Sequence, residues 1–303
     1  NRGLPRDLLR DVILIPPPRR STAARLRQQL SPLPDLAHRL RSPAWEAALR
    51  QLLGERRRED TRFDNVQVEG LELAWNLPLV RALQPQARLI YDAHNVEYQL
   101  QRTAFAADLR RPARWPAALY SLSQWPRLRR YEAETCRRAD AVACVSEQDA
   151  DTLRALSPGL RPVVVPNGLD LDEYPFSPPI ERDRPPRLVF TGKMDYRPNV
   201  DAVEWFVGEI FPLVRAARPD AEFHIVGQQP ERRVTALGAS PGVRVLGAVP
   251  DTRPHIAGAG VYVAPLRMGG GSRFKLLEAF ALGAPVVSTP LGAAGFPVAD
   301  ERE

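Results

Sequence analysis

The sequence predicts an α/β protein made of two Rossmann-like domains with parallel sheets, and three observations support this prediction. The chain has 303 residues, which is enough for two domains of ordinary size. In both halves short apolar runs alternate with helical patterns, which is typical of parallel strands flanked by helices. A proline-rich, charged segment, FSPPIERDRPP at 176–186, separates the halves and has the composition of a linker.

Composition excludes several classes of protein. With 44% hydrophobic and 26% charged residues, a disordered or fibrous chain is excluded. No apolar run is long enough to cross a membrane, and the first residues lack the pattern of a signal peptide. Cys136 and Cys144 are too few for a disulfide framework and fit no metal spacing, which favours a reducing cytoplasm. The chain starts at Asn1 and stops at Glu303 in mid-pattern, so we expect a fragment.

The first half, residues 1–175, is expected to form one domain. The apolar run DVILIPPP predicts a buried strand that prolines end. The strands expected in this half cover 11–18, 63–70, 88–95, 141–146 and 163–168. The helices expected between them cover 19–60, 71–84, 96–138 and 147–156.

The second half, residues 187–303, alternates more regularly and is expected to form the other domain. The segment 199–219 predicts an amphipathic helix, because Val203, Phe206, Ile210 and Val214 fall on one face. The strands expected here cover 187–192, 221–228, 243–249, 261–266 and 284–290. Ligands of such folds bind in the crevice beyond the carboxyl ends of the strands.

The block PLRMGGGSRFKLLEAFALGAPVV, 265–287, carries the strongest chemical signal. Gly269, Gly270 and Gly271 follow a strand and precede a helix, so backbone N–H groups and a helix N-terminus meet in an anion site. Lys275 and Glu278 lie three residues apart on one face of that helix. A diphosphate and a ribose would suit this cation and this carboxylate. A flexible turn before an ordinary helix is the alternative interpretation.

The two lysines support the same crevice. Of the 42 Lys and Arg residues, only Lys193 and Lys275 are lysines, and both follow strands of the second domain. Where arginine replaces lysine almost everywhere, a retained lysine suggests a need for a compact ammonium. Gly192 ends the strand before Lys193, and Arg197 follows in the same loop. Chance retention of solvated surface lysines is the alternative.

Two further motifs contain residues that could be functional. His94 ends a strand in YDAHNVE, where a structural histidine is the alternative to a functional one. Asp170 and Asp172 form a D-x-D that could suggest a metal-dependent nucleotide-sugar site, but it adjoins the linker, so no metal is expected. No nucleic-acid recognition motif is present.

At this point the residues resemble glycosyltransferase family 4, the retaining group-1 glycosyltransferases of GT-B fold. The matching stretches are YDAHNVE, AVACVSEQDADTL, VVVPNGLDLDEY, LVFTGKMDYRPNVDAV, EFHIVGQQP, VRVLGAV and GGGSRFKLLEAFALGAPVVST. The resemblance covers most of residues 88–295. The blocks that contain Gly192 and Gly269 are similar to those of bacterial exopolysaccharide sugar transferases.

The resemblance implies two parallel-sheet domains facing across a cleft and transfer of a hexose from a nucleotide-diphosphate sugar, without a metal. Catalytic roles would fall to His94, which would contact the donor sugar, and to Lys193 and Lys275. The expected donor-binding residues are Gly192, Arg197, Gly227, Val249, Gly269, Gly270, Gly271, Ser272, Arg273 and Glu278. Among them Glu278 would hold the ribose, and Gly227 and Val249 would lie near the base.

Two departures from the family pattern leave other functions open. The first of the family's two acidic residues would fall at Gly270, so backbone amides of 269–272 must act near the sugar. The family's first strand with its glycine loop, and its last helices, are expected beyond the two ends, so the N-terminal domain is incomplete. The alternatives are a nucleotide-sugar 2-epimerase of the same fold and a non-catalytic nucleotide-sugar-binding module.

The acceptor is expected to be a glycan or a lipid-linked precursor in cell-surface polysaccharide synthesis. The Arg- and Trp-rich segment 110–138, with Trp115 and Trp125, could touch anionic lipid at the inner face of the membrane. A solvated basic face is the alternative. We therefore expect a cytoplasmic bacterial protein, with peripheral membrane contact as one option.

Overall fold

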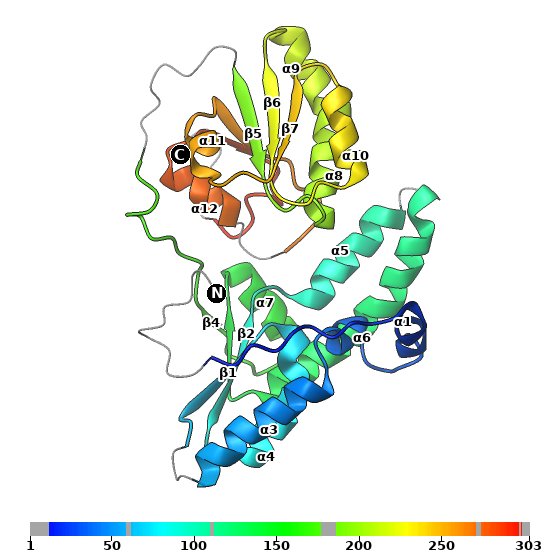
Figure 1. Cartoon of the computed structure of the whole chain (residues 1–303), viewed down its shortest axis with the longest axis vertical. Coiled ribbons are helices and arrows are strands. Elements are labelled where there is room, and N and C mark those ends of the chain that lie inside the picture. Colours follow the sequence, from blue (N-terminus) through cyan, green and yellow to red (C-terminus); the bar gives the residue numbers. More distant parts are fainter. Residues whose placement is uncertain are drawn as a thin grey trace. The chain divides into compact units, whose positions relative to one another are not determined.

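A computed structural model describes residues 12–58, 62–109, 112–176, 186–270, 274–296 and 298, and its contacts divide into two compact units (Figure 1). The first unit runs to Cys144 and includes Asp149–Val164. The second unit comprises Val145–Gln148 and the residues from Val165 onward. Each unit has its own parallel sheet and its own hydrophobic core.

The first unit holds a four-stranded parallel sheet. Its strands are β1 (Asn65–Glu69), β2 (Arg88–Ala93), β3 (Ala141–Cys144) and β4 (Val163–Val164), in the order β1-β2-β3-β4. Along β2 the buried residues are Leu89, Tyr91 and Ala93, which is the period-two pattern of a strand with one face on a core. The helices are α1 (Thr22–Gln28), α2 (Asp35–Arg39), α3 (Pro43–Arg58), η1 (Leu71–Asn76), α4 (Leu77–Leu83), α5 (Glu97–Leu109), η2 (Pro112–Arg114), α6 (Trp115–Arg138) and α7 (Glu147–Leu156).

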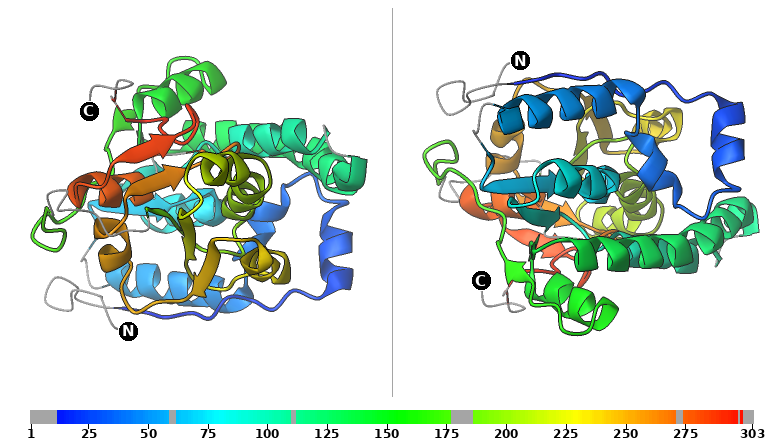
Figure 2. Two further views of the ribbon diagram at one scale, coloured as in Figure 1. Left: turned by 90° about the horizontal axis from the view of Figure 1, so that it is seen from above. Right: turned by 90° about the horizontal axis from the view of Figure 1, so that it is seen from below.

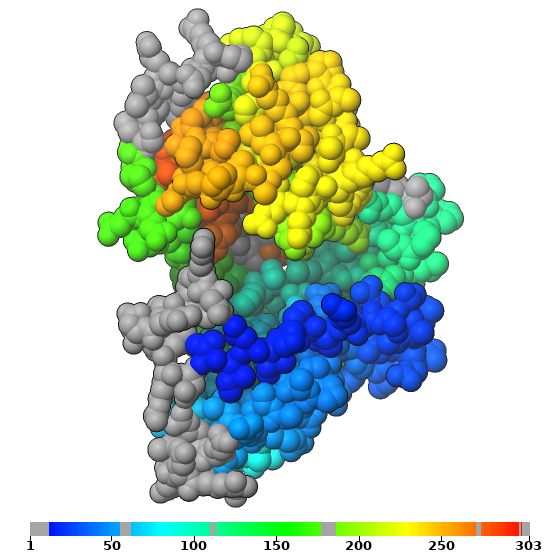
Figure 3. Space-filling view, in the orientation of Figure 1, coloured from blue at the N-terminus to red at the C-terminus, as the bar shows by residue number. Residues whose placement is uncertain are grey.

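The strand expected at 11–18 is wrong for the residues described there. Residues 12–20 have no regular secondary structure. The dark blue atoms of Figure 3, which begin with this segment, lie alongside the lighter blue atoms of the helices that follow. Pro16, Pro17 and Pro18 have no N–H to donate to a neighbouring strand, so this end of the run cannot join a ladder. Ile13 and Ile15 instead line a cavity against α3, and the expected burial is also wrong, because Val12, Ile13 and Leu14 are 47%, 54% and 65% exposed.

The second unit holds a five-stranded parallel sheet in the order β7-β6-β5-β8-β9. Its strands are β5 (Arg187–Thr191), β6 (Glu222–Val226), β7 (Val243–Gly247), β8 (Val261–Ala264) and β9 (Val286–Ser288). Its helices are α8 (Arg197–Trp205), the π-helical turn η3 (Phe206–Ile210), α9 (Phe211–Ala217), α10 (Arg232–Ala236), η4 (Leu237–Ala239), α11 (Arg253–Ala257) and α12 (Phe274–Ala281). The single helix expected at 199–219 is therefore α8 and α9 joined by η3.

Helices cover both faces of this second sheet (Figure 2). Phe190 of β5 belongs to the core that includes Val203 of α8, whereas its neighbour Val189 belongs to the core that includes Leu276 of α12. Successive strand residues point to opposite faces, so β5 is buried on both sides. This explains why the segment 187–192 is continuously apolar in its centre.

The observed units differ from the expected domains at residues 145–148 and 165–175, which both group with the second unit. Residues 165–175 were assigned from the sequence to the first domain, but they group with the second unit. The reason is contact: Tyr174 hydrogen-bonds Glu278, and the Glu173 carbonyl accepts a hydrogen bond from Arg253. Apart from residues 176 and 186, the expected linker lies outside the described residues.

Candidate functional site

The strand order of the second unit creates a topological switch point between β5 and β8. β6 lies on one side of β5 and β8 on the other, so the chain leaves these two neighbouring strands toward opposite sides. A crevice forms beyond the carboxyl ends of strands at such a point. Gly192 and Lys193 follow β5, and the glycine-rich loop follows β8. The sequence motifs of the second half therefore meet at this one edge of the sheet.

Two glycines allow the backbones at this edge to touch. Gly192 has φ +155° and Gly227 has φ +152°, which residues with a side chain rarely adopt. A Cβ on Gly227 would lie 1.7 Å from the Gly192 carbonyl oxygen, so no side chain fits there. The Gly192 N–H donates to the Val226 carbonyl at 3.0 Å. The backbones at the ends of β5 and β6 thus touch with no side chain between them.

The Lys275 ammonium is held next to Gly192. It donates to Oδ1 of Asn199 at 2.7 Å and lies 4.1 Å from the centre of the Phe190 ring. A Cβ on Gly192 would come within 2.9 Å of the Lys275 Nζ. Asn199, which is buried, donates through Nδ2 to the Lys193 carbonyl at 3.0 Å. One amide therefore ties the loop after β5 to the lysine of α12.

Lys193 and Arg197 lie in the same loop region, but their side chains have different surroundings. The Lys193 ammonium is 3.3 Å from the Asp195 carboxylate, and its side chain is 58% exposed. Arg197 is half-buried at the first position of α8. Asn199 thus connects the two lysines near the end of β5. Its side chain accepts a hydrogen bond from the Lys275 ammonium and donates one to the backbone carbonyl of Lys193.

The loop between β8 and α12 is anchored at its first residues. Arg267 makes two hydrogen bonds to the buried Asp201 carboxylate, at 2.9 and 3.1 Å, and its guanidinium stacks 4.7 Å from the centre of the Trp205 ring. Such a two-point pair fixes direction as well as distance. Gly269 and Gly270 follow this anchor. The remaining predicted loop residues, Gly271, Ser272 and Arg273, lie outside the described residues.

Glu278 has a specific partner that the sequence did not reveal. Its Oε1 accepts a hydrogen bond from the Tyr174 hydroxyl at 3.0 Å. Burial, followed by this bond to Glu278, raises the pKa of Tyr174. Glu278 is half-buried on α12, one turn from Lys275. Val249, predicted near the base, is half-buried two residues beyond β7 and packs against the core on the α12 face.

His94 lies in the first unit, directly after β2. Its Nε2 is 3.1 Å from the Glu69 carboxylate at the end of β1, and its side chain is 53% exposed. The side chains of Glu69, Asp92 and His94 each offer one possible metal-ligand atom. These three atoms lie within 4.8 Å of one another, which is close enough to bind one cation together. Gln67 already donates to both carboxylates, at 3.1 and 2.9 Å. The group is thus also explained as a hydrogen-bonded cluster of polar side chains.

A buried glutamate, Glu132, binds the backbone directly after the segment that carries His94. Glu132 of α6 is fully buried and accepts hydrogen bonds from the N–H groups of Glu97 and Tyr98, at 3.0 and 3.1 Å. Burial raises the pKa of Glu132 to about 8, although both N–H donors oppose the shift. Burial, and then the Glu72 carboxylate, raise the pKa of Glu97 to about 7. Two neighbouring carboxyl groups of the first unit, Glu97 and Glu132, are therefore expected to bind protons near neutral pH.

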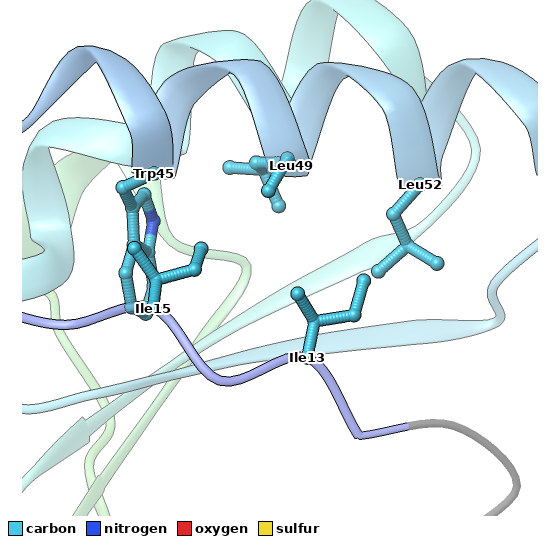
Figure 4. A pocket seen from close by; sticks show the side chains of 6 residues that line it. Ile13, Ile15, Trp45, Leu49 and Leu52 are labelled. Atoms are coloured by element: carbon cyan, nitrogen blue, oxygen red, sulfur yellow. The ribbon is translucent and has the colours of Figure 1, made fainter.

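An apolar cavity of about 190 Å³ lies in the first unit, away from the predicted site residues (Figure 4). Trp45, Leu49 and Leu52 of α3 face Ile13 and Ile15 of the segment that precedes α1. The cavity contains no charged side chain. It is therefore a packing gap beneath the N-terminal segment and offers nothing to hold a phosphate or a sugar.

Comparisons with known proteins agree with this architecture. Sucrose-phosphate synthase from Thermosynechococcus elongatus has a similar structure, with a TM-score of 0.56 and 19% identity, over 76% of this chain and 57% of that chain. HepE from Anabaena, in complex with UDP and glucose, gives a TM-score of 0.53 and 14% identity, over 82% of this chain and 65% of that chain. The chain is thus a two-domain protein of the GT-B glycosyltransferase fold, as predicted.

Sequence comparisons give the family. Residues 6–173 match the profile described as "Glycosyltransferase Family 4", and residues 185–302 match "Glycosyl transferases group 1". The chain belongs to glycosyltransferase family 4. A curated relative, phosphatidyl-myo-inositol mannosyltransferase of Propionibacterium freudenreichii, is 35% identical over 162 residues, which are 52% of this chain and 40% of that protein. This chain therefore matches less than half the length of that relative.

The length and polarity of the helices bear on membrane insertion. Among the described helices, not even the 24-residue α6 combines the length and apolar character needed to cross a bilayer.

Three residues of the site region were missed in the sequence. Asn199, Tyr174 and Glu132 each make their key bond to a residue more than 30 positions away. For Tyr174 and Glu132, nothing in the neighbouring sequence distinguishes them from ordinary polar residues. For Asn199 a signal was present, since it opens the expected helix directly after the lysine loop.

Proposed function

We propose that this chain is a retaining, metal-independent glycosyltransferase that moves a hexose from a nucleotide-diphosphate sugar to a glycan or lipid-linked acceptor in bacterial cell-surface polysaccharide synthesis, on the cytoplasmic side of the membrane. The observation that carries the proposal is the Lys275 ammonium next to the glycine backbone at the switch point of the second sheet. A fixed cation at this edge suits a diphosphate group.

The proposed chemistry is electrostatic. As the sugar leaves, negative charge grows on the nucleoside diphosphate, and cations already in place stabilise that charge without having to reorganise. Lys275 and the N-terminus of α12 face this charge, and Lys193 and Arg197 can reach it from the loop after β5. Glu278, oriented by Tyr174, accepts hydrogen bonds from the ribose hydroxyls. His94 contacts the donor sugar.

Relatives support the sugar and the nucleotide only by analogy. The curated relative is named a mannosyltransferase, and a structural neighbour is described with UDP and glucose bound. Mannose or glucose on a nucleoside diphosphate is therefore the donor to test first. The 2-epimerase and binding-module alternatives share the diphosphate site, so only turnover distinguishes them from a transferase.

Calorimetry with UDP and GDP tests the site. We expect Lys275→Ala to weaken binding of the preferred nucleotide at least tenfold. The control is Arg218→Ala, because Arg218 is an exposed arginine of the same unit paired with Asp220. Unchanged affinity in Lys275→Ala would refute the diphosphate site. Transfer or hydrolysis of UDP-glucose and GDP-mannose, followed by product release, then separates an enzyme from a binding module, and recovered epimerised donor would indicate the epimerase.

A second proposal concerns the exposed face of α6, which we place against an anionic bilayer surface. Trp115, Leu119 and Leu122 lie at helical spacing and are 55%, 67% and 45% exposed. Arg129 and Arg130 are exposed farther along the same helix. Exposed apolar side chains next to arginines suit the headgroup region of an anionic membrane. Such contact would bring the enzyme to a lipid-linked acceptor.

Vesicle sedimentation tests this surface. The protein should bind vesicles containing phosphatidylglycerol and release them as salt rises, since each basic residue contributes about 1 kcal/mol near an anionic surface. Leu119→Ser with Leu122→Ser should abolish binding, while Leu213→Ser, an equally exposed leucine of the second unit, should not. Equal binding to neutral vesicles, or no effect of the double change, would refute the proposal.

A further inference from the structure

Glu132 is a buried carboxylate that the proposed chemistry does not use. It lies in the middle of α6 with no exposed surface. Its two oxygens accept the N–H groups of Glu97 and Tyr98, and the Tyr91 hydroxyl is 3.5 Å from Oε1. A charge-bearing group is costly to bury, so a fully buried glutamate is expected to have specific partners. Here the partners are backbone groups at the start of another helix.

These backbone groups are the first two of α5. The first N–H groups of any helix have no partner within the helix, and a side-chain acceptor usually comes from the residue just before it. In α5 the acceptor comes from α6, more than 30 residues away in the chain. The first two N–H groups of α5 are therefore satisfied by the tertiary structure and not by a side chain directly before the helix.

This cap bears on His94 because the connection is short. β2 ends at Ala93, which is paired with Cys144 of β3, and α5 begins at Glu97. Only the segment His94–Asn95–Val96 lies between a strand held by the sheet and a helix held by Glu132. Val96 is buried, which leaves few conformations for this segment. Both ends of the segment that carries His94 are thus fixed.

We propose that Glu132 is a positioning residue for the transfer reaction, which holds the His94 segment in place by capping α5. The inference rests on the proposed role of His94. An amide cannot replace the carboxyl group fully: both carboxyl oxygens can accept an N–H, with or without a bound proton, whereas the NH₂ group of glutamine accepts none and would face one of the two N–H donors. Glu132→Gln therefore loosens one end of the segment while it keeps the size and shape of the side chain.

The experiment compares Glu132→Gln, His94→Ala and the double variant with Glu134→Gln. Glu134 is a matched control on the same helix, because its side chain is 41% exposed and pairs only with Arg137 and Arg138 of its own helix among the bonds described. Release of nucleoside diphosphate from UDP-glucose and GDP-mannose gives kcat and KM. Amide exchange reports the Glu97 and Tyr98 N–H groups, and the histidine ring resonances report the segment, with His224 and His255 of the second unit as internal references.

We expect Glu132→Gln to lower kcat at least tenfold with KM for the donor and UDP or GDP affinity within twofold of the wild type. Exchange at Glu97 and Tyr98 should accelerate at least tenfold, and the His94 resonances alone should shift or broaden. The double variant should be no slower than His94→Ala, because residues that act through one another are not additive.

Other outcomes overturn the proposal in distinguishable ways. An unchanged His94 signal in Glu132→Gln shows that the cap does not position the segment, whatever the turnover. Additive losses in the double variant show that Glu132 acts independently of His94. If His94→Ala leaves kcat unchanged, the proposed role of His94 fails, and the positioning role of Glu132 fails with it even where the exchange data establish the cap.

Discussion

The Lys275 ammonium lies 2.7 Å from Oδ1 of Asn199, and the Nδ2 of the same amide donates to the Lys193 carbonyl at 3.0 Å. A single buried side chain therefore connects the loop after β5 with the second residue of α12. The lysine is held before any ligand arrives. Preorganised charge of this kind stabilises a developing anion more than a mobile surface cation does.

Replacing Asn199 should affect both stability and binding. Asn199→Ala removes a buried donor and acceptor and leaves the Lys193 carbonyl without this donor, so we expect a loss of about 1–3 kcal/mol in the free energy of unfolding. Nucleotide affinity should fall about tenfold, since Lys275 becomes free to move. Denaturant unfolding and calorimetry measure the two effects. Asn199→Asp keeps the Oδ1 acceptor, and equal affinity in both variants would show that the Lys275 contact is unimportant.

The two lysines should respond differently to arginine. The Lys275 ammonium lies next to Gly192 and 4.1 Å from the Phe190 ring, where a planar guanidinium has no room. Lys275→Arg should therefore reduce nucleotide affinity about as much as Lys275→Ala. Lys193 has a 58% exposed side chain, so Lys193→Arg should bind within threefold of the wild type. Tolerance of arginine at position 275 would contradict the steric explanation for its retention.

Gly227 should not accept a methyl group. Gly227→Ala places a Cβ 1.7 Å from the Gly192 carbonyl oxygen at a positive φ, so we expect a loss of at least about 2–3 kcal/mol in the free energy of unfolding. Gly208→Ala is the control, because a Cβ there meets nothing within 4 Å. It lies within a helical stretch and should be neutral or stabilising by up to about 1 kcal/mol. Similar midpoints for the two variants in urea would be contrary to this expectation.

The stability of the first unit should fall as pH rises from about 5 to 8. Burial raises the pKa of Glu132 from 4.5 to about 8, so between these values the folded protein binds more protons than the unfolded chain. Ionisation in this window therefore costs stability, on the order of 2–4 kcal/mol in total. Glu132→Gln should flatten the pH dependence, with the rest of the slope due to Glu97, whose pKa is about 7.

The control for this pH profile is Glu134→Gln. The hydrogen bond from Arg137 holds the pKa of Glu134 below its ordinary value, so this group does not titrate between pH 5 and 8. Its profile should run parallel to that of the wild type. Urea unfolding at each pH, followed by a tryptophan signal, provides the measurement. A Glu132→Gln profile as steep as the wild type would show that Glu132 is already ionised throughout this range.

Chelation of divalent metals should leave nucleotide binding and sugar transfer unchanged. The proposed site supplies its own cations, Lys275, Lys193 and Arg197, for the leaving diphosphate. The expected result is the same calorimetric affinity and the same rate with EDTA as without it. Asp170→Ala should also be neutral, because its carboxylate accepts the N–H of Asp172 within its own turn. Loss of activity in EDTA that Mg²⁺ restores would point to a metal, with Glu69, Asp92 and His94 as ligands to examine.

Most of the fold could be predicted because its signals are local. Helix α7 (Glu147–Leu156) begins and ends where the sequence predicts, and each strand of the second sheet falls inside an expected run. The strand expected at 11–18 is wrong because strand pairing depends on residues distant in the sequence. An apolar run of this length is compatible with a strand. Within the described part of the chain, however, it pairs with no other strand, and Ile13 and Ile15 face α3.

The class of protein could be predicted from the chain alone, since the order of strands, the glycine block and the two lysines are all local features. The sequence also predicts that Lys193, Lys275 and the glycines lie at one edge of one sheet, because the carboxyl ends of parallel strands lie at the same edge. Which side chains touch could not be predicted, because those contacts depend on the packing of the folded chain. Asn199 holds Lys275, Tyr174 holds Glu278, and Glu132 caps the helix behind His94. These bonds join residues distant in sequence, and hydrogen bonding depends on tenths of an ångström that only packing can set.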